Sequence, residues 1–476
     1  MSTIQKTFKN TSWLFISQII TSIFGFFWIV LLGRYLGVSD FGTMNFAISF
    51  SVLMNLFIDL GISLYTTRDL SRYPDLAQKY IGNAIPLRIL LSTITLIATL
   101  IILSILNYDL LTTGVIILFL FHTIFLSTGE LFKGVFQAFS KQKYQAIGII
   151  INSTLVLLGT LILVYFDLGL ISVALAYISG SIISLIYLYI KIKQKIVVPK
   201  IEFDFSFWKS TIKSSVPFGI TIIFSTIYYM IDTVMLSFMD GSIAVGIYSS
   251  GYKIITVFIT IYAIYNFIIF PLMSRFYKDS KDLLKISYEK SVKYLIMMML
   301  PIAIGVSIYS SYIVTLIFGE AFILGGDVLR ILVWNVLFVM VNGASTNLLN
   351  ASNNELAVTK INGIACVINI IFNLIGIYYF SYMGASVTTV ITGIIICILM
   401  TYIITRGRYK PDMTLVYDII KISIAGAILG IFLVLVNLNF WIAIPVAIII
   451  YMIGLILTKS FDSVDKTIIK EVIGRK

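Results

Sequence analysis

The sequence predicts an all-α, polytopic membrane protein with about fourteen transmembrane helices, arranged as two six-helix lobes plus two C-terminal helices. Of its 476 residues, 59% are hydrophobic and only 12% are charged, about half the charged fraction of a soluble domain. Its mean hydropathy is +1.01. Apolar runs of about 20 residues, each long enough to cross a bilayer core of about 30 Å, recur along the chain. They are too long and continuous for the alternating strands of a membrane barrel.

The first apolar run, "FKNTSWLFISQIITSIFGFFWIVLLG", is interpreted as a span. It is too long for a cleavable signal peptide and lacks a small-residue cleavage site. Cys366 and Cys397 lie inside later runs and are expected to be free thiols. The predicted spans are 11–32, 43–66, 83–106, 110–135, 145–166, 169–190, 214–238, 244–272, 288–310, 326–349, 357–380, 384–404, 416–436 and 440–458.

The charge distribution supports an even number of spans. If both termini are cytoplasmic, the basic loops such as "RDLSRYPDLAQK" and "RFYKDSKDLLK" are cytoplasmic too, and about 30 of the 34 Lys and Arg residues lie on or next to that side. One missed span would invert every later loop. We therefore predict a cell-membrane protein with both termini inside. The net charge of +12 is explained by these loops, so no nucleic-acid partner is expected.

A polar stretch over about 191–213 divides the chain near its middle. Its "IEFDFSFWK" alternates apolar and polar residues, which is typical of a segment lying along the membrane surface. We predict an N-terminal six-helix lobe over 1–195, a second six-helix lobe over 196–405, and two accessory helices with a cytoplasmic tail over 406–476.

An internal repeat supports two lobes. The segment "LGRYLGVSDFGTM" (32–44) joins the first two spans, and "LSFMDGSIAVGIY" (236–248) joins the seventh and eighth. With one constant offset, Gly37 aligns with Gly241 and Gly42 with Gly246. Parallel repeats of this kind commonly form transporters that bind their substrate between the two halves.

The segment "VPFGITIIFSTIYYMIDTVMLSFMDGSIAVGIYSSGYKI" resembles the seventh and eighth spans of the prokaryotic polysaccharide flippases. These belong to the multidrug/oligosaccharidyl-lipid/polysaccharide exporter superfamily. "LLGRYLGVSDFG" and "IDLGISLYTTRDLS" resemble the first two spans of that family, and the resemblance covers the whole chain in span count and layout.

The resemblance implies two six-helix bundles in a V-shape around a central cavity, with alternating access. It implies that the substrate is a polyprenyl-pyrophosphate-linked oligosaccharide, moved from the inner to the outer leaflet. The partners expected on this basis are that substrate, membrane lipids, and glycosyltransferases or a polymerase of the same pathway.

Ionisable residues inside spans are the candidate site residues, since each costs roughly 2.5–3.5 kcal/mol at a span centre and usually faces an interior or a wet cavity. A first group lies toward the outer half: Arg34, Asp232, Lys253 and Arg330. Asp232 and Lys253 lie at similar depths, so they are expected either to form a structural ion pair or to serve transport. In the second case Arg34 and Lys253 attract an anionic headgroup, and Asp232 braces Lys253 or loses a proton.

A second group, Asp59, Arg68 and Arg88, lies toward the inside. Both arginines can reach the cytoplasmic headgroups with their long side chains. Alternatively, the three residues form an inward mouth that meets a pyrophosphate, because a guanidinium can bind phosphate oxygens through two hydrogen bonds.

The predicted fourth span carries His122, Glu130 and Lys133. Glu130 and Lys133 are three residues apart, which predicts a local ion pair. His122, the only histidine, is interpreted as a hydrogen-bonded core residue, with a titrating role in a proton-coupled cycle as the alternative.

No enzyme is predicted, because the chain lacks a glycine-rich phosphate loop, a metal-ligand cluster and a long outer loop. No cofactor or metal is expected. The alternatives of the same superfamily are a multidrug exporter, which would need an acidic cavity, and a lipid II flippase. The enzymatic alternative is a membrane polysaccharide polymerase or glycosyltransferase.

Overall fold

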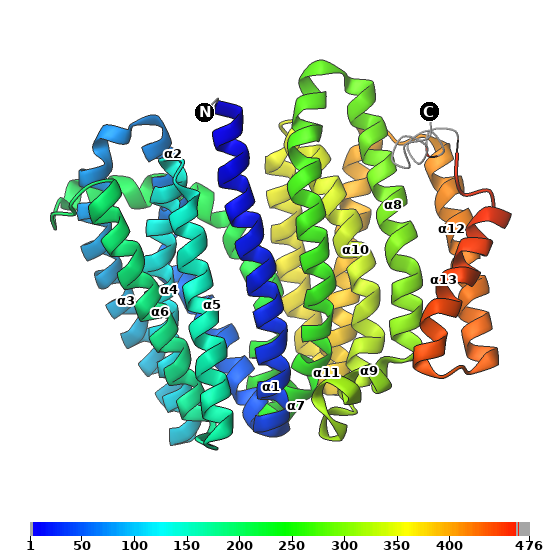
Figure 1. Cartoon of the computed structure of the whole chain (residues 1–476), viewed down its shortest axis with the longest axis horizontal. Helices are drawn as coiled ribbons and strands as arrows, with labels where there is room; N and C mark the ends of the chain where they lie inside the picture. Colours follow the sequence, from blue (N-terminus) through cyan, green and yellow to red (C-terminus); the bar gives the residue numbers. More distant parts are fainter. Residues whose placement is uncertain (1–2, 463–464, 466–476) are drawn as a thin grey trace. The chain divides into compact units, whose positions relative to one another are not determined.

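The computed structural model describes residues 3–462 and 465 and divides into two compact units, 1–249 and 250–476. Each unit is a bundle of long helices (Figure 1). The all-α membrane fold predicted from the sequence is confirmed. The predicted lobe boundaries at 195 and 405 remain predictions.

Over residues 3–249, the first unit contains six helices, one short 3₁₀ turn and the first part of a seventh helix. They are α1 (Thr3–Asp59), α2 (Ile62–Arg72), η1 (Pro74–Leu76), α3 (Ala77–Leu106), α4 (Leu110–Ala138), α5 (Gln142–Tyr165), α6 (Gly169–Lys195) and the start of α7 (Phe205–Asp279).

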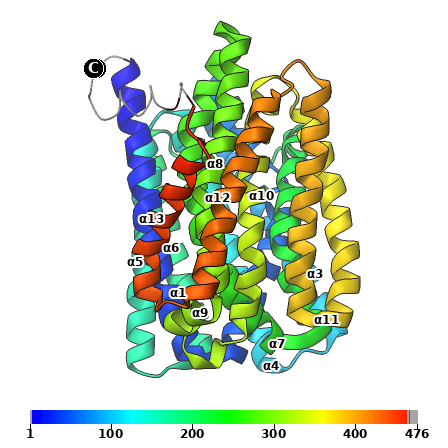
Figure 2. The same cartoon turned by 90° about the vertical axis from the view of Figure 1, so that its right-hand side faces the viewer.

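The second unit contains the rest of α7 and the remaining elements. They are α8 (Lys281–Ile308), α9 (Ser310–Phe318), η2 (Glu320–Phe322), α10 (Gly325–Ala351), α11 (Glu355–Arg406), α12 (Met413–Val436) and α13 (Phe440–Leu457). Figure 2 shows α12 and α13 side by side along α8. Their shared core includes Ile422, Leu429 and Leu455, against which Leu300 of α8 packs.

Eleven candidate membrane spans are found among the described residues. Three of them are long enough to cross twice and contain one non-helical residue. They are Ser12–Asp59 at Gly37, Ile222–Asp279 at Gly241 and Glu355–Arg406 at Ser381, with lengths of 48, 58 and 52 residues. Counting each of these three as two gives the fourteen predicted segments.

The repeat glycines adopt matching conformations. Gly37 has φ 69° and ψ −178°, and Gly241 has φ 84° and ψ −174°. A positive φ is accessible to glycine without steric cost, so each glycine lets one helix end and the next begin without a loop. Gly42 and Gly246 follow at the same spacing, and a Cβ at Gly42 would lie 2.8 Å from the nitrogen of Gly246. The aligned glycines therefore make equivalent turns that pack against each other.

The predicted second span is wrong at its end, because the helix stops at Asp59 rather than continuing to residue 66. Leu60 and Gly61 both have positive φ, and α2 begins at Ile62. A Cβ at Gly61 would lie 2.6 Å from the carbonyl oxygen of Ser215 on α7. Close packing of α7 therefore accompanies a break that the apolar pattern does not reveal.

The segment between α6 and α7 has no regular secondary structure and lies on the start of α3. Glu202 accepts hydrogen bonds from Gln78 at 3.2 Å and Asn83 at 3.1 Å. The alternating residues Ile201 and Phe203 point outward and are exposed. The alternation seen in the sequence therefore separates an inward acidic side chain from outward apolar ones, while a position along the membrane surface remains a prediction.

Candidate functional site

Arg88 on α3 is buried inside the first unit, with 1% of its side chain exposed. Its guanidinium donates hydrogen bonds to Asp59 at the end of α1, to Ser63 Oγ on α2 at 2.6 Å and to Ser127 Oγ on α4 at 2.6 Å. Ser63 Oγ in turn donates to Asp59 Oδ1 at 2.6 Å. This network joins four helices around one ion pair.

The network excludes one of the two alternatives for Arg88. The interpretation in which its side chain extends to the headgroups is wrong, because the guanidinium points into the bundle and is held by Asp59 and two serines. A buried charge needs a partner and hydrogen bonds, and Arg88 receives both. A role of Asp59 and Arg88 in binding substrate stays a prediction.

Arg68 on α2 differs from Arg88 because its side chain is exposed. The guanidinium carbon lies 4.6 Å from the ring centroid of Phe218 and 5.6 Å from that of Tyr65, and a nitrogen lies 3.4 Å from Asp69. Stacking on aromatic rings orients a guanidinium while its edge stays available for hydrogen bonds. Arg68 can therefore present donors to an anion at the surface of the first unit.

Asp232 lies on α7 before the Gly241 turn, and Tyr248 lies after it. Both are buried, and the Tyr248 hydroxyl donates to Asp232 Oδ2 at 2.9 Å. This hydrogen bond joins the two parts of α7 on either side of the turn. Lys253 is partly buried and belongs to the second unit, so its pairing with Asp232 stays a prediction.

The remaining basic candidates lie near helix turns or helix starts. Arg34 is exposed on α1, three residues before Gly37. Arg330 lies in the first turns of α10, with a nitrogen 3.6 Å from Asp327, and both side chains are about half exposed. Their role as substrate-binding cations stays a prediction.

The three candidate residues on α4, His122, Glu130 and Lys133, make the contacts expected of structural residues. His122 is buried, and its Nδ1 lies 2.9 Å from the Tyr177 carbonyl oxygen on α6. The two rings meet edge to face at 5.1 Å. Glu130 and Lys133 form the local ion pair that their spacing predicts. These contacts explain His122, Glu130 and Lys133 as residues that stabilise the fold. A role of His122 or Glu130 in coupling transport stays a prediction.

No metal centre is apparent within residues 3–462 and 465, where no group of three or more His, Cys, Asp or Glu side chains could hold an ion. Cys366 and Cys397 are free, as predicted.

A family described as "Polysaccharide biosynthesis protein" matches residues 7–277, which is more than half of the chain. The chain belongs to the polysaccharide biosynthesis protein family. A second family, MatE, matches residues 217–375. The resemblance to the polysaccharide flippases of the exporter superfamily is therefore confirmed at the level of the family.

Solved structures show the same fold. The lipid II flippase MurJ, in an inward closed conformation, matches with a TM-score of 0.79 and 18% identity over 94% of this chain and 98% of that one. An inward-facing multidrug transporter of the MATE family matches with a TM-score of 0.65 and 12% identity, over 82% of this chain and 94% of that one. These likenesses show that the chain shares the all-α fold of those two proteins.

An uncharacterised membrane protein of Methanocaldococcus jannaschii is 27% identical over 272 residues. The match covers 54% of this chain and 53% of that relative, so the chain spans about half the length of the curated relative that it matches.

This member of the polysaccharide biosynthesis protein family also contains a group of buried amides that the sequence analysis missed. Asn342 on α10 donates to the carbonyl oxygen of Gly393 on α11 at 3.0 Å, and Asn373 donates to Asn369 at 3.1 Å. The signal was present, because Asn335 and Asn342, and likewise Asn369 and Asn373, recur at helical spacing within apolar runs. Neutral amides are not ionisable, so a search for charged residues inside spans does not select them.

Proposed function

We propose that this protein is a flippase that moves a polyprenyl-pyrophosphate-linked oligosaccharide from the inner to the outer leaflet of the cell membrane by alternating access. The observation that carries the proposal is the match to the polysaccharide biosynthesis protein family over residues 7–277. The proposal places both termini in the cytoplasm and assigns no catalytic step to the protein.

The negative charge of the proposed substrate is complementary to the positive charges of the candidate site residues. A pyrophosphate carries negative charge and several acceptor oxygens, which arginine can bind through paired hydrogen bonds. Arg68, stacked on Phe218 and exposed, supports an entry contact for this group. Arg34 and Lys253 are proposed to bind it further along its path.

The Asp59–Arg88 network is proposed to support this site rather than to bind substrate. Arg88 already donates to Asp59, Ser63 and Ser127. Its Nε is buried and makes no hydrogen bond with the described residues. A guanidinium held in this way fixes the C-terminal end of α1 and the N-terminal end of α2. Since α2 also carries Arg68, the network helps to hold Arg68 in position.

Asp232 is proposed to act as a brace, because it accepts a hydrogen bond from Tyr248 across the Gly241 turn. An asparagine keeps an oxygen that can accept this bond, so we expect Asp232→Asn to retain transport and Asp232→Leu to lose it. The measurement is the transport rate in proteoliposomes. Loss of transport in Asp232→Asn, at normal folded yield, would instead favour a role in carrying a proton.

The function is tested with purified protein in liposomes that carry a fluorescent polyprenyl-pyrophosphate oligosaccharide. A membrane-impermeant reductant then reports how much substrate has reached the accessible leaflet. We expect accelerated exchange relative to protein-free liposomes. Exchange of lipid II alone would favour the lipid II flippase, and uptake of a cationic dye alone would favour the multidrug exporter.

A further inference from the structure

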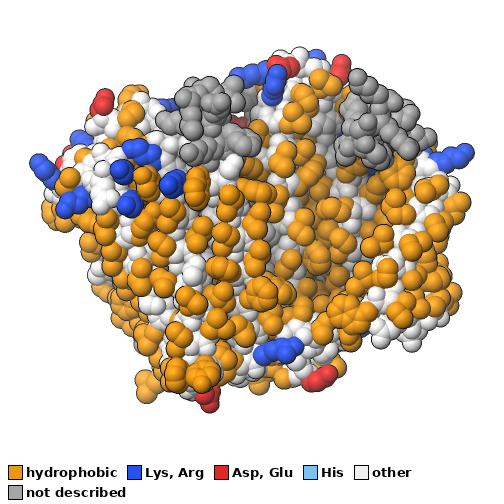
Figure 3. Space-filling model, in the orientation of Figure 1, with side chains coloured by type: hydrophobic (Ala, Val, Ile, Leu, Met, Phe, Trp, Pro, Cys, Tyr) orange, Lys and Arg blue, Asp and Glu red, His pale blue; other side chains and the backbone are white. Residues whose placement is uncertain are grey.

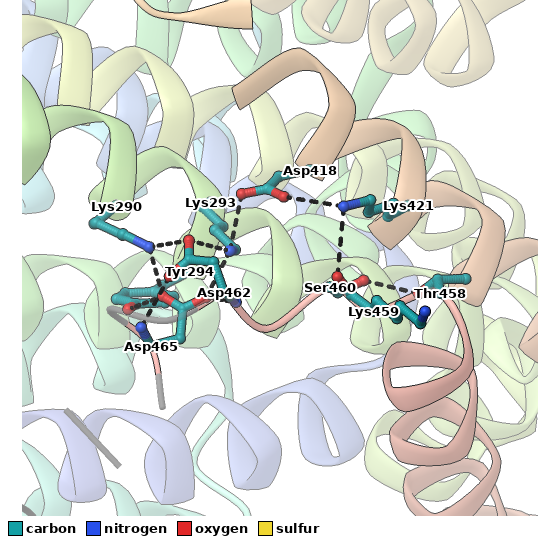
Figure 4. Close-up of polar contacts among 10 residues, drawn as sticks. All are labelled: Lys290, Lys293, Tyr294, Asp418, Lys421, Thr458, Lys459, Ser460, Asp462 and Asp465. Atoms are coloured by element: carbon teal, nitrogen blue, oxygen red, sulfur yellow. Dashed lines mark hydrogen bonds and ion pairs between the residues drawn. The ribbon is translucent and has the colours of Figure 1, made fainter. Parts of the chain in front are cut away.

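A second group of charges lies in the second unit, away from the residues discussed above. Lys290, Lys293 and Tyr294 occupy one side of α8 in the second half of its first fourteen residues, and Lys293 is buried with 1% of its side chain exposed (Figure 4). A lysine so far from water needs compensating carboxylates.

The carboxylates come from two other parts of the unit. Asp418 on α12 lies 2.8 Å from the Lys293 ammonium, and Asp465, beyond α13, lies 2.6 Å from it. Lys290 pairs with both Asp462 and Asp465, the latter at 2.6 Å. Asp465 is 2% exposed. We call these six residues, Lys290, Lys293, Tyr294, Asp418, Asp462 and Asp465, the charge latch.

Backbone hydrogen bonds orient the side-chain carboxylates of Asp462 and Asp465. The Asp462 nitrogen donates to Asp465 Oδ2 and the Asp465 nitrogen donates to Asp462 Oδ1, both at 2.9 Å. This reciprocal pattern resembles a helix capping box. Tyr294 donates to Asp465 at 2.6 Å. The carboxylates are therefore held in place before they meet the lysines, so little conformational entropy is lost in pairing.

The charge latch lies at one end of an apolar cavity of about 680 Å³ between α8 and α13. Met298 and Pro301 form part of one wall and Met452 part of the other. Tyr294 of the charge latch and Phe461, next to Asp462, line its end. The cavity separates the two helices along part of their length, where Tyr451 of α13 still donates to the Met297 carbonyl oxygen of α8 at 2.9 Å. The charge latch adds a second set of contacts to α8, beyond the C-terminal end of α13.

We propose that the charge latch is a conformational device that holds the end of α13 against α8 and closes that end of the apolar cavity. When Asp462 and Asp465 leave the lysines, the end of α13 moves away from α8 and the cavity opens there. This inference does not depend on the substrate of the protein.

The test measures the distance between spin labels on the full-length protein in nanodiscs, with Cys366 and Cys397 replaced by serine. The labels replace Ile286 on α8 and Leu457 on α13, which are both exposed. We expect Asp462→Asn/Asp465→Asn to add a population with a longer distance, because asparagine can still cap but carries no charge. The control is Asp279→Asn, which removes the exposed ion pair with Arg275 and is expected to leave the distance unchanged.

The double variant leaves Lys293 with fewer counter-charges, so a triple variant adds Lys293→Met. It removes the buried charge together with two of its three carboxylates and leaves Asp418 near Lys421, and we expect it to show the longer distance as well. An unchanged distance in either variant would overturn the proposal. In particular, a longer distance only in the double variant would show that an uncompensated charge, and not loss of the charge latch, moves α13.

Discussion

At the scale of single residues, Asp59 and Arg88 show how a charge is kept inside an apolar bundle. The sequence indicated that Asp59 needs a partner but left the partner open, since Arg88 is 29 residues away on another helix. Ser63 and Ser127, which complete the network, carry no signal in a hydropathy profile. Pairings of this kind depend on how helices pack, and an isolated apolar pattern does not contain that information.

We predict that Arg88→Met destabilises the protein strongly, because it leaves Asp59 without its ion-pair partner. Breaking a buried pair by removing one partner costs about 3–5 kcal/mol, whereas replacing both is often near neutral. The double variant Asp59→Asn/Arg88→Met should therefore melt closer to the wild type than Arg88→Met alone. Thermal unfolding in detergent measures both.

The control for this prediction is Arg275→Met, because the pair between Arg275 and Asp279 is exposed. Exposed pairs contribute about 0–1 kcal/mol, so we expect little change in Tm. If Arg88→Met and Arg275→Met shifted Tm equally little, the buried network would have no structural role.

At the scale of helices and turns, the repeat glycines were the most informative part of the sequence. Their alignment predicted equivalent positions, and Gly37 and Gly241 share one backbone conformation. By contrast, the break at Gly61 was missed, because the flanking residues stay apolar and the close approach of α7 is a tertiary contact. The presence of a span therefore follows from the local apolar sequence. The residue at which a span ends depends partly on how neighbouring helices pack against it.

We predict that Gly42→Ala disrupts packing in the first unit. The added Cβ would lie 1.8 Å from the carbonyl oxygen of Ser242, and the backbone there cannot move aside as a flexible side chain would. The matched control is Gly114→Ala on α4, where nothing lies within 4 Å of the new Cβ. Folded yield and Tm should fall sharply for the first variant, and the second should be neutral or slightly stabilised. Equal yields and Tm values would contradict the close packing.

The charge latch has a predicted pH dependence. Burial alone would raise the pKa of Asp462 and Asp465, but hydrogen bonds from Lys290 and Lys293 outweigh it and hold both pKa values below the usual range. A depressed folded-state pKa contributes stability that is present above the unfolded value, about 3.9, and is lost as pH falls through the folded value. The distance between the labels on α8 and α13 should therefore stay constant from pH 8 to pH 5. Lengthening within that range would contradict the ion pairing.

At the scale of the whole molecule, the fold class and span number could be predicted because both follow from chain-wide quantities: hydropathy, run length and the positions of basic loops. The buried amides of α10 and α11 and the charge latch could not. Asn342 and Asn369 are neutral, and Asp465 lies far along the chain from Lys293. Residues that act through long-range pairing become visible only when the helices are assembled.

The central claim is that this protein moves an anionic lipid-linked oligosaccharide, and the exchange assay in proteoliposomes tests it most directly. We predict that the wild type accelerates exchange of the polyprenyl-pyrophosphate oligosaccharide and that Arg34→Ala and Lys253→Ala each abolish it at unchanged folded yield. Arg275→Ala, at an exposed ion pair, should exchange the substrate at the wild-type rate. Wild-type exchange no faster than in protein-free liposomes would contradict the function, and normal exchange by both Arg34→Ala and Lys253→Ala would contradict the proposed cationic path.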